Sequence, residues 1–400
     1  MPTHLPLLWS AALVLALAGC AQLAANTSAG ATDGGVRSCR WQVGETHLVS
    51  STFPGSGCAL RDLAPSGDGA WLFAVCDWGS GSSEAWRAFV RRIDGAGVAL
   101  SDGLSGTWPV RADSEGWLFD YDSLAIDDAL ARRAALIWSV DPLPGGPAFV
   151  DLGRRGVPEF VPVVLGLPLA GPRHLRAHRA GFTCVAERGA APWGVSLVRL
   201  DPLGAQVAAR DLGLPPMPVP FQRIALPDRS FVMTWTDAGQ LHLRRYDEDG
   251  AARTDEAMTL DEHVVSAPQA AVVQAGDGLL AIWESGWASL SARRLDADGR
   301  PLAPARTITA LDGYSAGLSA TSAAGDVLVS AVVGETQPRV VVAVLDRDGV
   351  TRGEAIEVGR SRNPRWMRRF TRIVSTPGGA LVAFEGEYRS VSTAPLRCEP

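Results

Sequence analysis

The chain has 400 residues, of which 46% are hydrophobic, so it is long enough and apolar enough to bury a large core. Acidic residues outnumber basic ones by 43 to 37, and the formal net charge is −6. This balance argues against a nucleic-acid-binding protein that depends on neutralising phosphates. Every basic residue of the chain, histidine apart, is an arginine, which we attribute to a GC-rich genome.

The N-terminus has the pattern of a targeting segment. An apolar run from Leu5 to Ala18 is too short for a membrane span and is typical of a signal-peptide core, although only His4 could supply the positive charge expected before it. "LAGC", ending at Cys20, resembles the lipobox of bacterial lipoproteins. That resemblance implies cleavage before Cys20 and acylation of its thiol and new amino group. The alternative is an ordinary secretory signal.

Residues 20–35 are small and polar, and we expect a flexible tether. We therefore divide the chain into a signal peptide (1–19), a linker (20–35) and a folded part (36–400). In lipoprotein families an Asp just after the acylated cysteine favours the inner membrane, and here Ala21 and Gln22 follow instead. The expected location is the cell envelope, at the outer membrane rather than the inner one.

One phrase recurs along the chain: a hydrophobic alternation followed by an aspartate and a glycine-containing turn, as in "LSARRLDADG" ending at Gly299. Such self-similarity over about fifty residues signals a repeat architecture. Each unit contains four short strands separated by turns, and the second strand is apolar almost throughout. Four antiparallel strands per repeat describe a β-propeller. The repeated aspartates are Asp94, Asp141, Asp201, Asp247, Asp296 and Asp346.

Six units are complete, and the last, from Phe370, ends after its third strand. The stretch from Asp33 parallels the fourth strand that follows Asp348. We therefore expect an all-β, seven-bladed propeller closed by pairing of N- and C-terminal strands. A propeller of six or eight blades is the alternative, because the second unit is irregular near residues 123–133, where we expect a short helix. The competing fold is a pair of β-sandwiches.

The six cysteines suggest two bridges. Cys58 and Cys76 are equally distant from Gly67 on the two arms of one hairpin, which would bring their side chains together. Cys39 and Cys398 lie on the terminal strands that should pair, so a bridge there would clamp the ring shut. Cys184 is left over as a buried thiol. Two bridges suit an oxidising compartment outside the cytoplasm.

First strands of propeller blades line the central channel, and here they repeatedly carry basic residues. Converging guanidinium groups bind carboxylates or phosphates, so we mark a candidate anion-binding channel. The alternative is that these residues form blade-to-blade salt bridges with the carboxylates that end the second strands, such as Glu187, Glu284 and Glu385. The channel candidates are Arg61, Arg111, His174, Arg176, Arg223 and Arg372.

Two metal-site interpretations are weaker. The Asp-x-Asp-Gly turns offer fewer oxygens than calcium loops need, and hydrogen-bonded turns explain them better. His174 and His178 are four residues apart and would share a face of a strand, but no carboxylate or cysteine nearby completes a ligand set. We expect no metal and no cofactor.

The sequence resembles secreted bacterial β-propeller lipoproteins of unassigned function. That resemblance implies a membrane-anchored binding or scaffold module, monomeric and non-enzymatic, whose partner is an unknown protein or glycan. The alternative is a propeller-fold hydrolase or lyase acting on extracellular glycans, and the sequence identifies no catalytic residues for it. A catalytic propeller needs convergent carboxylates at the channel mouth, whereas a binder does not.

Overall fold

A computed structural model provides the structure of the chain and describes the residues between Cys39 and Glu399, with gaps. Arg40–Glu399 forms one compact unit. In the described part, no helix is both long and apolar enough to cross a membrane. The described ranges are 39–49, 56–77, 86–100, 108–109, 123–127, 132–139, 146–151, 160–162, 169–188, 194–214, 221–264, 268–286, 288–361, 371–386 and 390–399.

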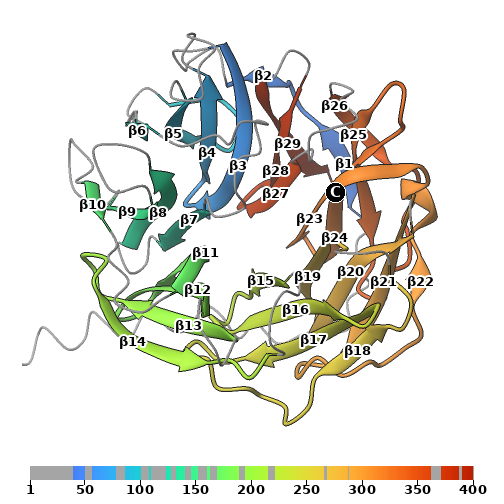
Figure 1. The fold of residues 1–400 in the computed structure, drawn as a ribbon. Helices are drawn as coiled ribbons and strands as arrows, with labels where there is room; N and C mark the ends of the chain where they lie inside the picture. The colour runs from blue at the N-terminus through green and yellow to red at the C-terminus, as the bar shows by residue number, and fades with distance from the viewer. Residues whose placement is uncertain are drawn as a thin grey trace, which may run out of the picture. The chain divides into compact units, whose positions relative to one another are not determined.

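In the described residues, six sheets each contain four antiparallel strands that follow one another along the chain (Figure 1). These are β3–β6 (Ser56–Ser66, Gly69–Asp77, Trp86–Ile93, Trp108–Pro109), β7–β10 (Ser123–Asp127, Arg132–Ser139, Gly146–Asp151, Phe160–Pro162), β11–β14 (Leu169–His178, Gly181–Arg188, Val195–Leu200, Gln206–Asp211), β15–β18 (Phe221–Ala225, Phe231–Asp237, Gln240–Tyr246, Met258–Asp261), β19–β22 (Ala270–Ala275, Gly278–Gly286, Ser289–Leu295, Arg306–Thr307) and β23–β26 (Tyr314–Ala323, Asp326–Val333, Arg339–Leu345, Ile356–Arg360). One short 3₁₀ helix, η2 (Thr309–Leu311), lies between β22 and β23.

The remaining sheet joins the two ends of the folded unit. β27 (Thr371–Thr376), β28 (Gly379–Glu385) and β29 (Val391–Glu399) come from the C-terminal part, and β1 (Arg40–Val43) adds beside β29. Trp41 lies opposite Cys398, and β2 (His47–Leu48) also pairs with β29. The expected pairing of the terminal strands is therefore confirmed. The six other sheets are each continuous in sequence. The last unit, which we expected to take its fourth strand from the N-terminal part, is this composite sheet.

The first strands of the sheets form a closed cycle, and we call them the inner strands. Each contacts the inner strand of the following sheet, and β27 contacts β3, which completes the cycle (Figure 1). The cycle confirms an all-β propeller and excludes the pair of sandwiches. The inner strands are β3, β7, β11, β15, β19, β23 and β27.

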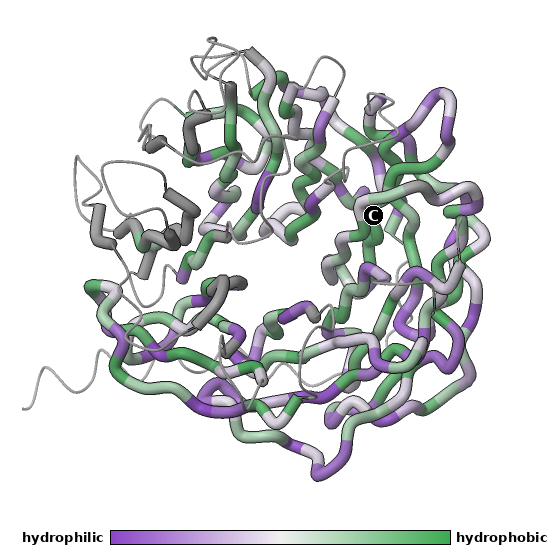
Figure 2. The backbone as a smooth tube through the Cα atoms, viewed as in Figure 1, coloured by the Kyte–Doolittle hydropathy of each residue, from purple (hydrophilic) through white to green (hydrophobic). Residues whose placement is uncertain are grey.

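Hydrophobic clusters fill the spaces between neighbouring sheets. Ile282 and Val329 belong to one cluster shared by two sheets, and Leu72 and Leu381 belong to another, across the point of closure. Because both faces of a blade are covered, its second strand is largely apolar. All eight residues of β24 are buried. Figure 2 shows these hydrophobic stretches within the sheets and hydrophilic residues gathered at the outer turns.

The recurring turn is held by its first aspartate. Asp296 Oδ1 accepts hydrogen bonds from the backbone amides of Asp298 (2.9 Å) and Arg300 (2.8 Å). Gly299 has a φ of +94°, which glycine adopts without strain. The same aspartate position accepts from the backbone amide four residues on in Asp94, Asp201, Asp247 and Asp346, whereas Asp141 lies outside the described residues. The hydrogen-bonded interpretation of these turns is therefore confirmed.

The third position of the same turn connects neighbouring sheets. Asp348 forms an ion pair with Arg294 of the preceding sheet, and Asp249 lies 3.7 Å from Arg199 in the same way. In these two turns, one aspartate shapes the turn and the other contacts the preceding blade.

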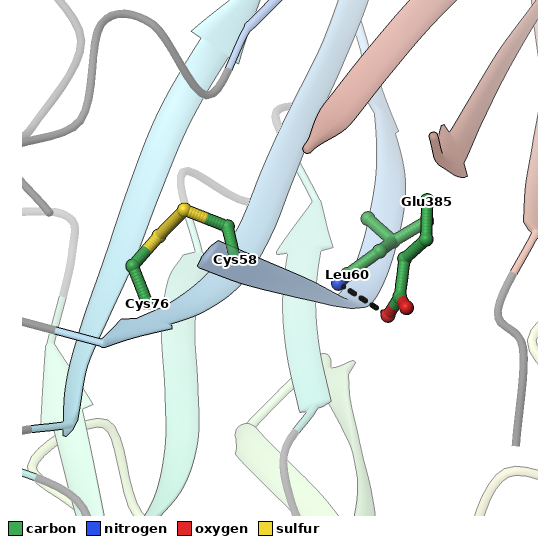
Figure 3. The surroundings of a disulfide bond; sticks show 4 residues. All are labelled: Cys58, Leu60, Cys76 and Glu385. Carbon is green, nitrogen blue, oxygen red and sulfur yellow. Dashed lines mark hydrogen bonds between the residues drawn. A yellow bond between two sulfur atoms is a disulfide. The ribbon is translucent and has the colours of Figure 1, made fainter. Parts of the chain in front are cut away.

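Both predicted disulfides are present. Cys58 and Cys76 are bonded to each other and lie opposite each other on β3 and β4 (Figure 3). Cys39 and Cys398 are also disulfide-bonded. Cys184 is a free, buried thiol, and Cys58 and Cys76 are bonded to each other. The sixth cysteine, Cys20, could bond only one of Cys39 and Cys398, so these two must bond each other.

The expected short helix near residues 123–133 is wrong. Ser123–Asp127 and Arg132–Ser139 are the antiparallel strands β7 and β8. Leu124, Ala125 and Ala134 are buried there, and Ala125 and Ala134 pack in a cluster shared with the next sheet. Burial between sheets overrides the helical propensity of this alanine- and arginine-rich segment.

Candidate functional site

Charged side chains gather on one arc of the inner strands, from β27 through β3 and β7 to β11. Asp62 of β3 lies between two guanidinium groups contributed by other sheets. Its Oδ1 is 4.0 Å from Arg372 Nε, and its Oδ2 is 3.9 Å from Arg176 Nη1. The Arg372 and Arg176 side chains are 31% and 30% exposed, whereas that of Asp62 is only 15% exposed. We call these three residues the Arg–Asp–Arg cluster.

Asp62 is fixed by the backbone rather than by the arginines. Its Oδ1 accepts from the Leu63 amide and its Oδ2 from the Leu124 amide, both at 2.9 Å. The second of these bonds links β3 to β7. An irregularity in the pairing of β3 with β4, between Leu60 and Asp62, accompanies this position. The carboxylate is therefore held in place as an acceptor of backbone hydrogen bonds.

Arg176 is oriented by carbonyl groups. Its Nη1 donates to the carbonyls of Leu124 (3.1 Å) and Leu175 (2.8 Å). Two pairing shifts in β11, on either side of Arg173, precede it and change the alternation of side chains along the strand. Arg372 is held similarly, because its Nη1 donates to the Thr371 carbonyl at 3.2 Å.

Arg223 of β15 is buried rather than displayed. It is 5% exposed, and its guanidinium lies 4.3 Å from the centre of the Phe231 ring. It donates to the His174 carbonyl (3.2 Å), the Thr183 carbonyl (3.3 Å) and Thr183 Oγ1 (2.9 Å), so it joins neighbouring sheets. Burial, together with repulsion from Arg176, lowers the pKa of Arg223 to about 9, while Cys184 acts in the opposite direction.

Elsewhere among the inner strands, two links between sheets are neutral: Gln222 Oε1 of β15 accepts from the Ala270 amide at 3.0 Å, and Ser319 Oγ of β23 accepts from the Ile373 amide at 3.1 Å. Asp62 makes the same kind of link. These neutral examples show that a link between neighbouring sheets does not require a negative charge. We therefore relate the charge of Asp62 to the two arginines beside it.

Two of the carboxylates that end the second strands accept hydrogen bonds from backbone amides of neighbouring elements. Glu385 Oε1 accepts from the Leu60 amide at 2.9 Å, between the closing sheet and β3 (Figure 3). Glu284 accepts from the Gln269 amide at 3.0 Å and from the Tyr314 hydroxyl. In these contacts, Glu284 and Glu385 connect structural elements by accepting hydrogen bonds from backbone amides and from a phenol.

Both ring nitrogens of His178 are engaged by other groups of the chain. His178 is buried, its Nδ1 accepts from the Ala180 amide at 3.0 Å, and its Nε2 lies 3.2 Å from Asp249 Oδ1. Both ring nitrogens are therefore occupied by hydrogen bonds, with the proton on Nε2. Among the described residues, no group of three potential metal ligands is found.

The predicted basic residues that the structure describes fall into three groups. Arg176 and Arg372 converge on Asp62, whereas Arg61 and Arg223 are buried. His174 is partly buried, with a φ of +55°, and contributes its carbonyl. Cys20 and Arg111 lie outside the described residues. Sequence reasoning missed Asp62, although its place directly after Arg61 on a first strand was the available signal.

No protein-family model matches the chain, and no curated protein is significantly similar to it. A puromycin hydrolase aligns over 82% of this chain and 50% of its own, with 17% identity and a TM-score of 0.51. A puromycin-hydrolysing peptidase of Mycobacterium tuberculosis aligns over 85% of this chain and 51% of its own, with 15% identity and a TM-score of 0.49. The chain thus spans about half the length of these proteins.

The β-propeller domain of the Trilobed protease from Pyrococcus furiosus is matched over most of both chains. The alignment covers 85% of this chain and 94% of the domain, with 10% identity and a TM-score of 0.50. That propeller is described as having an open velcro topology, whereas β1 and β29 are paired here. At these identities the similarities establish the fold alone, and they show that the chain is a β-propeller protein.

Proposed function

We propose that the chain is an extracytoplasmic binding module, tethered to the cell envelope by acylation of Cys20, that recognises its ligand through the propeller. The observation that carries this proposal is the Arg–Asp–Arg cluster: two partly exposed guanidinium groups flank one carboxylate on the inner strands. Arginine remains charged in water and recognises anionic groups through a rigid fork of donors.

The same cluster is poorly suited to acid–base catalysis. A general acid or base must exchange protons near neutral pH, and arginine does not. Asp62 offers a carboxylate, but each of its oxygens already accepts a backbone hydrogen bond. This arrangement favours binding over the hydrolase or lyase alternative.

Two disulfides support placement in an oxidising compartment outside the cytoplasm. The anchor is tested by Cys20→Ser. The variant is expected to move from the membrane pellet to the soluble fraction, while a variant that still pellets would contradict the anchor. If that anchor faces the periplasm from the outer membrane, the wild-type chain should co-fractionate with outer-membrane proteins.

Binding without turnover is tested on the purified full-length chain. Incubated with neutral and acidic polysaccharides, it is expected to release no new reducing ends and no unsaturated sugars. Release of either product would assign the chain to the hydrolase or lyase alternative.

A further inference from the structure

We propose that the disulfide between Cys39 and Cys398 is a redox-sensitive latch on the closing sheet. When a dithiol reduces it, β1 and β2 open away from β29, while the rest of the propeller stays folded. The bridge joins the residue before β1 to β29, at the place where the two ends of the folded unit meet. This inference goes beyond the proposed function and does not depend on acylation of Cys20.

The bridge stands where other sheets have a turn. In several of them the chain turns back directly after the third strand, as between Leu295 and Pro301, which pair with each other. The closing sheet has no such turn, because its third strand, β29, and its fourth, β1, come from opposite ends of the folded unit. Apart from the bridge, the covalent path between these two strands runs through all the other sheets. Reduction therefore removes the short connection that keeps β1 beside β29.

The strand β1 has few buried contacts to hold it once the bridge is reduced. It lies at the end of the sheet, and Trp41 is its single buried residue. Trp41 donates to Asp326, and the backbone amides of Gly44 and Val49 donate to carbonyls of β29 at 2.8 and 2.9 Å. Segments at an edge with few buried side chains are those that open locally in folded proteins. The remaining hydrogen bonds close the strand again, so the reduced latch opens and closes.

The rest of the closing sheet is held more firmly. β29 lies between β1 and β28, and its residues 391–396 are all buried. It pairs with β28 at seven positions. The ring stays closed without β1, because β27 contacts β3 directly. Opening is therefore confined to the N-terminal strands, and it uncovers the outer edge of β29.

Burial makes this bridge the one that a reductant reaches first. Cys58 and Cys76 are 2% and 0% exposed within the hairpin of β3 and β4 (Figure 3). Cys39 and Cys398 are each partly exposed. Thiol–disulfide exchange requires a thiolate to approach a sulfur atom, so a buried bridge is protected from it. A mild dithiol should therefore reduce the terminal bridge and leave the hairpin bridge intact.

The dithiol alone balances the reaction. Its thiolate attacks one sulfur of the bridge, forms a mixed disulfide and releases the other cysteine as a thiolate. The second thiol of the dithiol then displaces the bonded cysteine and closes the reagent into a cyclic disulfide. The dithiol thereby gives up its electron pair and its thiol protons, and Cys39 and Cys398 become thiols.

The first test asks which bridge is reduced. The full-length chain, purified in detergent under native conditions, is treated with increasing dithiothreitol. Its thiols are then blocked with iodoacetamide and located by peptide mass spectrometry. We expect Cys39 and Cys398 to be labelled at concentrations that leave Cys58 and Cys76 bonded. Reduction of both bridges together, or of the hairpin bridge first, would overturn the latch.

Hydrogen exchange measures the opening. After selective reduction, peptides within residues 40–49 should exchange their amide hydrogens at least roughly tenfold faster, as local opening requires. Peptides from β24, whose eight residues are all buried, should not change. Protection of residues 40–49 should return when the thiols are reoxidised. Unchanged exchange in these residues would overturn the proposal. Faster exchange throughout the propeller would overturn it too, because the bridge would then be a general structural stabiliser.

Variants separate the latch from the general effect of losing a disulfide. Cys39→Ser combined with Cys398→Ser should show fast exchange in residues 40–49 without reductant, and no further response to it. The matched control is Cys58→Ser combined with Cys76→Ser, which should respond to dithiothreitol as the wild type does. If either double variant fails to fold, the wild-type chain before and after reduction still decides. Slow exchange in the first variant, with or without reductant, would overturn the proposal.

Discussion

Trp41 Nε1 donates a hydrogen bond of 2.9 Å to Asp326 Oδ2, and this bond ties the first strand of the folded unit to a neighbouring sheet. Trp41 is 8% exposed and Asp326 is 2% exposed. Arg352 Nη1 donates to the other carboxylate oxygen at 2.8 Å. The strand β1 is therefore secured in the closing sheet by its pairing with β29, by the bridge at Cys39 and by a buried charged hydrogen bond.

Trp41→Phe should destabilise the fold by about 1–3 kcal/mol, because it leaves a buried carboxylate oxygen without its donor. Urea unfolding of the full-length chain measures this loss. Trp235→Phe is the matched control, since Trp235 is also buried and its indole nitrogen makes no hydrogen bond in the described structure. Equal losses in the two variants would mean that ring volume, rather than the bond to Asp326, stabilises the closure.

The two aspartates of one recurring turn should contribute unequally. Asp296→Ala removes an acceptor of two backbone amides and should cost about 1–2 kcal/mol. Asp298→Ala removes a partly exposed ion pair, 3.7 Å from Arg300, and should cost under about 1 kcal/mol. Unfolding free energies of the two variants compare the positions directly. The reverse order would refute the turn-shaping role of the first aspartate.

The repeating unit could be predicted because its signals are local. The aspartate of each turn bonds within four residues of itself, and Cys58 and Cys76 follow from their symmetry about Gly67. Alternation and apolar second strands depend only on which faces are buried. These features survive in a single sequence without any knowledge of distant contacts.

The site could be predicted only in part, because it depends on contacts between sheets. Arg372 reaches Asp62 only after the closure of the ring places β27 beside β3. The pairing shifts before Asp62 and Arg176 are irregularities that the alternating pattern does not reveal. Nor does the pattern distinguish Arg223, buried over Phe231, from the partly exposed Arg176.

Alkaline pH should destabilise the fold through Tyr246. Its hydroxyl donates to the Leu212 carbonyl at 2.8 Å, and burial raises its pKa to about 12, although Arg244 acts in the opposite direction. The unfolded phenol titrates near pH 10. Above that pH the unfolded chain loses a proton that the folded chain retains, so stability falls as pH rises from about 10 to about 12.

Tyr246→Phe should therefore be less stable than the wild type at neutral pH, by about 1 kcal/mol, and should lose stability less steeply above pH 10. Unfolding free energies measured between neutral pH and pH 11 give both slopes. Tyr314 also has a raised pKa, caused by burial and by Glu284, so some alkaline loss should remain in this variant. Parallel slopes would show that the Tyr246 proton is not linked to folding.

Counting thiols tests the cysteine assignments together with the anchor. Burial raises the pKa of Cys184 to about 12, opposed by Arg223, so the native chain should not react with Ellman's reagent at neutral pH through this residue. Unfolding without reduction should expose Cys184 and leave both bridges intact. If Cys20 is acylated, one thiol then reacts. If Cys20 is retained without modification, it adds a second thiol, which also reacts before unfolding. Reaction of more than these two thiols would contradict the bridge between Cys39 and Cys398.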